Sequence, residues 1–194
     1  RNFDNEIFAT TFMNHVGFLS PRTFKVKTNI SNQNVVYLFQ ESLKKELLEF
    51  NKKIEGPILE SKEDKFNHLK MSRLSNKEWM KKNKNRYIAS LNSIIDYNLI
   101  LMKAYKFQIS GASDETVRID SKTLKKTEFK QISIFDAFMY SIGAAHGLSF
   151  DDRRFYFDTV YSRLEPIYYD GDVNILSKIN YHRYSGKFEK RLKN

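Results

Sequence analysis

The segments HGLSFDDRRFYFD (residues 146–158) and EPIYYDGD (residues 165–172) decide how this chain is interpreted. Each contains a run of aromatic and β-branched residues, Phe155–Phe157 and Ile167–Tyr169, and such runs are typical of β-strands. The connection at residues 159–163 is short enough to close a hairpin. The sequence therefore predicts a polar loop, a strand, a tight turn and a second strand that ends in acidic residues.

Carboxylates flank this predicted hairpin at its open end. Asp151 and Asp152 precede the first strand, and Asp170 and Asp172 follow the second. Pairing of the two strands brings these acids to one edge, where they repel one another unless a divalent cation lies among them. We therefore predict a metal site with Asp152 and Asp170 as ligands. The residues alone leave open an alternative, in which these are solvated aspartates in surface turns.

The order of these features is the order found in kinases. Phosphoryl transfer requires Mg²⁺ held by carboxylates and one polar group that orients the attacking hydroxyl. In kinases a catalytic loop precedes the metal-binding Asp, as the loop at residues 146–152 precedes Asp170 here. Asp152 and Asp170 are therefore the candidate catalytic residues. His146 ends a predicted helix, and we interpret it as a structural hydrogen-bonding residue rather than a catalytic one.

The same residues resemble a known family. RFYFD (154–158) and EPIYYDGD (165–172) are similar to the C-terminal half of the CotH kinase domain, an atypical, secretory-type protein kinase first recognised in a spore-coat protein. The N-terminal part follows the family's order of helix, strand, turn and strand, and ends in YLFQE (37–41). The resemblance covers roughly residues 1–50 and 140–176.

The resemblance implies a fold, a reaction and cofactors. The fold is α+β and kinase-like: a mostly helical body with an N-terminal β-hairpin and a small C-terminal hairpin that carries the acidic site. The resemblance implies that residues 1–194 form one domain of this type without its N-terminal strands. It also implies that this domain transfers phosphate from ATP, with Mg²⁺, to Ser or Thr of a partner protein. Asp170 takes the metal-binding position, and Asp172 and Glu41 join it in binding the cofactors. The family is bacterial and is found in spore coats, on cell surfaces or as secreted protein.

Two departures from the family pattern favour a second interpretation. The family usually has an Asn where this chain has Asp151 and Asp152, and its phosphate-binding Lys would lie before Arg1. Glu41, which would hold that Lys, is then an ordinary acid at a helix N-terminus. The alternative is a catalytically inactive kinase-fold module that binds a protein or polyanion through basic faces. Lysines 81, 82 and 84 are candidates for such a face.

Composition limits the remaining choices. The net charge is +10, which permits an anionic partner, with nucleic acid less favoured than protein. The chain has no Cys, which excludes disulfides, Cys-ligated zinc and iron–sulfur clusters. No apolar run approaches the roughly 18 residues of a membrane span, so we predict no transmembrane segment. Metal-assisted hydrolysis is a third possible activity, because clustered carboxylates also serve hydrolases.

The hydrophobic pattern predicts the other elements. Residues 3–16 form a helix, residues 24–30 form a half-buried strand, and residues 35–39 form a more buried return strand. A capping box at residues 75–78 starts a long helix that runs to about residue 105. The residues expected to face the core are Tyr87, Leu91, Ile94, Ile95, Leu99 and Met102. A second capping box at residues 133–136 starts a helix that buries Phe135 and Met139.

Overall fold

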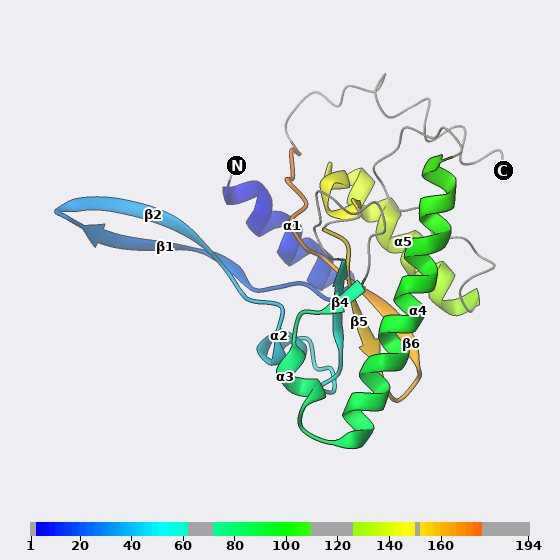
Figure 1. Cartoon of the computed structure of the whole chain (residues 1–194). Coiled ribbons are helices and arrows are strands. Elements are labelled where there is room, and N and C mark those ends of the chain that lie inside the picture. Colours follow the sequence, from blue (N-terminus) through cyan, green and yellow to red (C-terminus); the bar gives the residue numbers. More distant parts are fainter. Residues whose placement is uncertain (1–2, 62–71, 110–125, 150–151, 176–194) are drawn as a thin grey trace.

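The computed structural model describes residues 3–61, 72–109, 126–149 and 152–175 (Figure 1). The chain combines helices with two antiparallel sheets, so the α+β class is confirmed. The helices are α1 (Phe3–His15), α2 (Lys45–Phe50), α3 (Lys77–Met80), α4 (Lys84–Ile109), α5 (Lys126–Ser141) and the 3₁₀ helix η1 (Ala145–Leu148). The strands are β1 (Thr23–Ile30), β2 (Gln33–Gln40), β3 (Ile58–Ser61), β4 (Ser72–Leu74), β5 (Arg154–Asp158) and β6 (Arg163–Ile167).

The larger sheet has the strand order β4-β3-β5-β6, and every pair is antiparallel. The predicted C-terminal hairpin is confirmed as β5 and β6, which pair from Arg154 with Ile167 to Asp158 with Arg163. It is not a separate small hairpin, because β5 also pairs with β3. Pro166 lies in β6, an edge strand of the sheet, where its missing N–H breaks no central ladder.

Strand β5 is buried on both faces, so successive side chains enter different parts of the core. Phe155 and Phe157 pack with Tyr97 of α4 and Ile132 of α5. Tyr156, between them, packs on the opposite side with residues that include Leu47 and Leu48 of α2. A strand buried in this way is fixed in position, and so are the residues that directly precede it.

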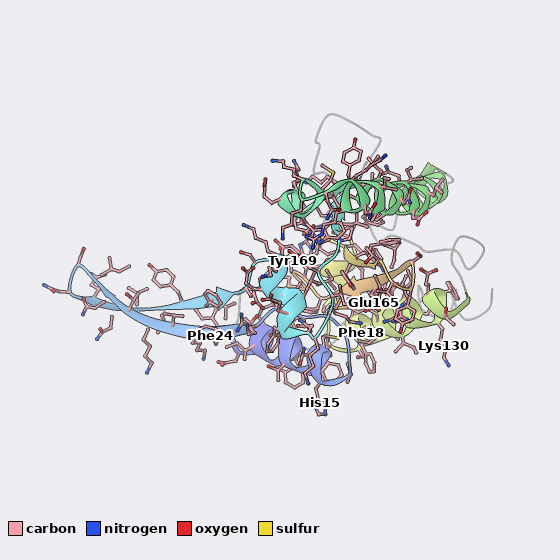
Figure 2. The ribbon with its side chains drawn as sticks, turned by 90° about the horizontal axis from the view of Figure 1, so that it is seen from below. His15, Phe18, Phe24, Lys130, Glu165 and Tyr169 are labelled. Carbon is pink, nitrogen blue, oxygen red and sulfur yellow. The ribbon has the colours of Figure 1, made fainter. Side chains whose placement is uncertain are left out.

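The predicted N-terminal hairpin exists, but neither of its strands is buried as predicted. Strands β1 and β2 form a sheet of their own, joined through Ser31 and Asn32, whose φ angles of 50° and 63° suit a tight turn between twisted strands. The hairpin projects from the body of the protein (Figures 1 and 2), and Phe24 lies on this projection. Phe24 and Tyr37 are each 49% exposed, so the alternating pattern marks an apolar face that the described residues leave in solvent.

The predicted long helix is two helices, and its buried face was predicted correctly only in part. Helix α3 ends at Met80 and α4 begins at Lys84, and Asn76 makes no side-chain capping bond. Tyr97 is fully buried, and Ile94 packs against the same core as predicted. Other residues predicted to face the core are exposed, among them Leu91 by 40% and Ile95 by 56%. Small polar residues, Ser90 and Ser93, lie on the buried face instead. They permit a close approach of α4 to the sheet.

Helix α5 begins seven residues before the predicted capping box, at Lys126. Ser133 is therefore inside the helix, and its hydroxyl donates to the carbonyl oxygen of Phe129 at 2.7 Å. The predicted core face is confirmed, since Phe135 and Met139 are buried. Within the part of the chain that the structure describes, no helix has both the length and the apolar character needed to cross a membrane.

Candidate functional site

The candidate site lies at the open end of the β5–β6 hairpin. Asp152 stands two residues before the start of β5, and Asp170 stands three residues after the end of β6. Because Arg154 pairs with Ile167, both acids leave the sheet at the same end. Asp151, the neighbouring acid in the predicted cluster, lies outside the described residues.

A turn fixes Asp152 before the strand begins. The Ser149 hydroxyl donates to Oδ2 of Asp152 at 2.8 Å, and the Asp152 N–H donates to the same hydroxyl oxygen at 3.2 Å. The Arg153 N–H then donates to the Ser149 carbonyl oxygen at 3.1 Å. These bonds hold the Asp152 carboxylate in one orientation relative to η1.

Arg153 anchors this turn to the core. Its side chain is 1% exposed and its Nη2 donates to both carboxylate oxygens of Asp136, at 2.8 and 2.7 Å. Its carbonyl oxygen accepts a bond from the Tyr97 hydroxyl at 3.1 Å. The backbone next to Asp152 is therefore held by α5 and by α4. Burial raises the pKa of Tyr97 well above its usual value, so this hydroxyl stays a donor.

The segment that carries Asp170 is anchored on its other side by the N-terminal part of the chain. The Tyr168 N–H donates to the Leu19 carbonyl oxygen at 2.8 Å, and the Tyr168 hydroxyl donates to Oε1 of Glu6 at 3.0 Å. Burial and the nearby Glu6 carboxylate raise the pKa of Tyr168 far above its usual value. Asp170 adopts a left-handed backbone conformation with φ of 41°, which Asp tolerates better than most residues.

Two glycines let η1 and the segment after β6 approach each other closely. A Cβ atom on Gly147 would lie 2.4 Å from the carbonyl oxygen of Tyr169. A Cβ atom on Gly171 would lie 2.6 Å from the hydroxyl oxygen of Tyr168 and 2.8 Å from the Cβ of Ala144. A side chain at Gly147 would force the two segments apart, and one at Gly171 would collide with Tyr168 and with Ala144, the residue before η1.

The result is a cluster of three residues: His146, Asp152 and Asp170. One potential ligand atom from each lies within 4.8 Å of the others, and Nε2 of His146 lies 3.3 Å from Oδ2 of Asp152. Ligands on one divalent ion, each at about 2.0–2.4 Å from it, lie up to about 4–5 Å apart. The donor set and its spacing therefore fit a single divalent cation.

The structure thus brings together the two residues predicted as metal ligands and catalytic residues, Asp152 and Asp170. It adds His146, which we interpreted from sequence as structural. Two other predicted cofactor residues are not in the cluster. Asp172 has an exposed side chain, and Glu41 is paired with the guanidinium of Arg22 at the base of the β1–β2 hairpin. Hydrogen bonding to Glu41 raises the pKa of Arg22 further. The roles of Asp172 and Glu41 in cofactor binding stay predictions.

The lysines proposed for a basic face are mostly engaged with acids. Lys82 lies 2.8 Å from an oxygen of Glu55, and Lys81 lies 2.9 Å from an oxygen of Glu78. These pairs neutralise part of the positive charge at the start of α4. Lys and Arg concentrate at residues 62–86, 122–130 and 183–193. Part of the first two stretches and all of the third lie outside the described residues.

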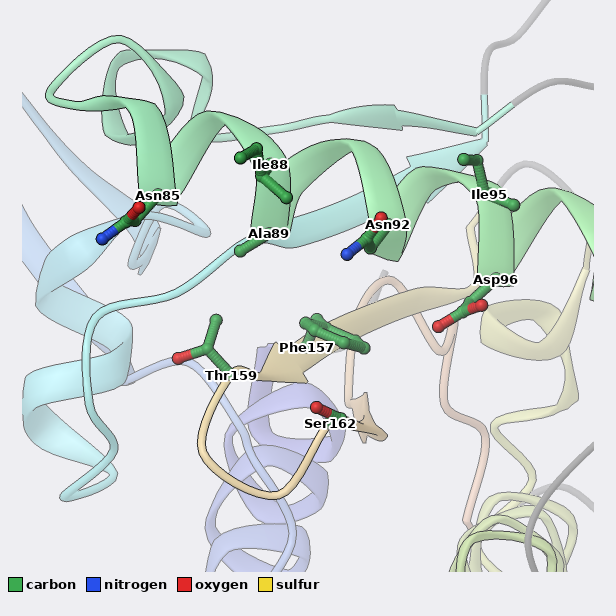
Figure 3. Close-up of a pocket in the computed structure, with 9 residues that line it drawn as sticks. All are labelled: Asn85, Ile88, Ala89, Asn92, Ile95, Asp96, Phe157, Thr159 and Ser162. Atoms are coloured by element: carbon green, nitrogen blue, oxygen red, sulfur yellow. The ribbon is translucent and has the colours of Figure 1, made fainter.

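A groove of about 560 Å³, lined by both polar and apolar side chains, lies between α4 and the turn of the β5–β6 hairpin (Figure 3). Asn85, Asn92 and Asp96 line it from α4, and Thr159 and Ser162 line it from the hairpin. This is the closed end of the hairpin, and the length of β5 places it about 15 Å from the end that carries Asp152. The groove and the acidic cluster are separate features.

Comparison with known proteins gives no independent assignment. The chain matches no protein-family model, and no curated protein matches it.

Proposed function

We propose that this chain is a metal-dependent phosphotransferase domain of the kinase-like CotH type. Its substrates in this proposal are ATP and a Ser or Thr hydroxyl of a partner protein. The observation that carries the proposal is the convergence of Asp152, which precedes β5, and Asp170, which follows β6, on one point that fits a divalent cation. The order of loop, hairpin and acid, and the resemblance of the flanking aromatic strands, support the same interpretation.

The proposed chemistry assigns a role to each acid. Asp170 ligates the cation, which neutralises charge on the phosphates of ATP when it is bound. Asp152 is a second ligand or orients the attacking hydroxyl, and its bond from Ser149 keeps one carboxylate oxygen aligned. Asp172, two residues after Asp170, supports the first acid. Because Arg153 and Tyr168 anchor the two acids from different sides, the ligands are held in place without the cation.

The experiment is a calorimetric titration of the chain with ATP in the presence of divalent cation, followed by a phosphotransfer assay on a Ser/Thr-rich acceptor protein. We expect metal-dependent ATP binding that Asp170→Asn abolishes, because the amide cannot neutralise the cation. Glu78→Gln removes one carboxylate from an exposed site outside the cluster and is the matched control. It should bind ATP as the wild type does.

Two outcomes contradict the proposal. If the wild-type chain binds no ATP with Mg²⁺ or Mn²⁺, the enzymatic interpretation is wrong. If Asp170→Asn binds ATP as tightly as the wild type, nucleotide binding does not use the acidic cluster. Either result favours the alternative of an inactive interaction module.

A further inference from the structure

His146 completes the cluster through a short element of its own. Helix η1 follows α5 after a turn at Gly143, which has a φ of 71°, and the Gly147 N–H donates to the Ala144 carbonyl oxygen at 3.2 Å. Gly147 packs against the Tyr169 carbonyl group, which is bonded to the nitrogen of Asp170. The imidazole of His146 is therefore placed beside Asp152 and Asp170 by backbone packing and not by a flexible loop.

The separation within the cluster suits ligands of one ion. Two neighbouring ligands at about 2.1 Å from a metal lie about 3.0–3.4 Å apart in octahedral or tetrahedral geometry. The distance from Nε2 of His146 to Oδ2 of Asp152 is 3.3 Å. The imidazole nitrogen is thus positioned as a ligand next to a carboxylate oxygen.

An imidazole ligand changes which cation the cluster prefers. Mg²⁺ and Ca²⁺ are hard ions that take oxygen ligands, whereas imidazole nitrogen suits first-row transition ions. One neutral imidazole and two carboxylates also give the cluster a charge of −2, which balances one dication. A site of two aspartates alone would not favour transition ions over Mg²⁺ or Ca²⁺.

The cluster also leaves room for exchange with solvent. The side chain of His146 is 52% exposed, whereas that of Asp152 is 17% exposed. A cation can therefore enter from the His146 side, and its remaining positions stay open to water or a phosphate oxygen. Closed structural metal sites lack such open positions.

We propose that His146 is the third ligand of the cation site, and that this site takes a first-row transition-metal dication, such as Mn²⁺, in preference to Mg²⁺ or Ca²⁺. The inference rests on the cation site of the proposed function but not on phosphotransfer. It assigns to the site an ion class that the two carboxylates alone do not specify.

The test measures binding of the metal alone to tag-free protein. Wild type, His146→Asn and His15→Asn are titrated with MnCl₂ and with MgCl₂ by calorimetry. His15 is an exposed histidine in the last turn of α1, so His15→Asn is the matched control. Pulsed EPR of the bound Mn²⁺ reports directly whether a nitrogen nucleus is in its coordination shell, and thermal unfolding verifies that each variant is folded.

We expect tighter binding of Mn²⁺ than of Mg²⁺ to the wild type, with a nitrogen coupling in the EPR spectrum. His146→Asn should weaken Mn²⁺ binding at least about tenfold, the size of effect seen when metal sites lose supporting groups, and should abolish the nitrogen coupling. Its amide oxygen can replace the imidazole for Mg²⁺, so Mg²⁺ binding should change only a few-fold. His15→Asn should bind both ions as the wild type does.

The outcomes separate this inference from the proposed function. Nitrogen-coupled Mn²⁺ that depends on His146, in a chain that binds no ATP, supports the inference and contradicts phosphotransfer. ATP binding that needs Asp170, together with Mn²⁺ binding unchanged in His146→Asn, overturns the inference and leaves phosphotransfer standing. Absence of Mn²⁺ and Mg²⁺ binding to the wild type overturns both.

Discussion

Substitution of Gly147 by Ala tests whether the close packing of η1 creates the cation site. The added Cβ would lie 2.4 Å from the Tyr169 carbonyl oxygen and 2.8 Å from Cε of Met139. A relaxed carbon–oxygen contact is about 3.3 Å or longer, so the carbonyl group must move by about 1 Å. That group belongs to the peptide that joins Tyr169 to Asp170, so its movement displaces Asp170 relative to His146. We expect a loss of about 1–3 kcal/mol in the free energy of unfolding and at least about tenfold weaker Mn²⁺ binding.

Gly56→Ala is the matched control for this experiment. A Cβ on Gly56 would lie 2.8 Å from the Phe157 carbonyl oxygen and 2.9 Å from Cε2 of Tyr156. The steric conflict is similar, but Phe157 lies toward the opposite end of β5 from Asp152. Urea unfolding and calorimetric Mn²⁺ titration of both variants should therefore show similar losses of stability and a loss of affinity only for Gly147→Ala. Wild-type affinity in Gly147→Ala would refute the positioning role of this contact, and equal losses in both variants would show that general loosening is the cause.

Two ion pairs give further predictions. Asp136→Ala leaves the buried guanidinium of Arg153 without its carboxylate partner. Urea titrations should show a free energy of unfolding lower by about 3–5 kcal/mol. A loss under about 1 kcal/mol would contradict an anchoring role for this pair. Glu55 accepts hydrogen bonds from Lys82 and Arg86, and the bond from Lys82 is the main cause of a pKa below the usual value for Glu. Because the pKa of Glu55 is lower in the folded state, ionised Glu55 stabilises the folded protein at pH values above its unfolded-state pKa of about 4.3. This stabilisation is lost as the pH falls through the folded-state pKa. At pH 7 the free energy of unfolding of the wild type should therefore exceed that of Glu55→Gln by about 1 kcal/mol at most, and near pH 3 the two should be almost equal. An equal difference at both pH values would rule out this linkage.

The sequence was sufficient for the β5–β6 hairpin and for the meeting of Asp152 and Asp170. Both follow from local information: two aromatic runs, a short turn and acids at the outer ends. Once the strands pair in register, the outer ends are neighbours whatever surrounds them. The pattern could not show that β3 pairs with β5, because Ile58–Ser61 is a short run without strict alternation.

Burial was harder to predict than secondary structure. Alternation in β1 and the aliphatic stripe of α4 each indicated an apolar face that would be buried. In both cases the described residues leave much of that face exposed to solvent, as at Phe24 and Ile95. Periodicity identifies an apolar face but carries no information about what packs against it. In α4 the sheet selects the face with Ser90 and Ser93 because small side chains permit the closer contact that buries Tyr97.

His146 shows why the third ligand could not be found from sequence. Its spacing to Asp152 and Asp170 matches no metal-binding motif, and a histidine after a helix is usually structural. Its place in the cluster depends on the absence of a side chain at Gly147, which lets η1 contact the peptide before Asp170. That contact in turn requires the segment after β6 to be held by Leu19 and Glu6, more than a hundred residues earlier in the chain. A ligand set assembled through such remote anchors depends on the whole fold. Variants that loosen any one anchor should therefore weaken cation binding before they unfold the protein.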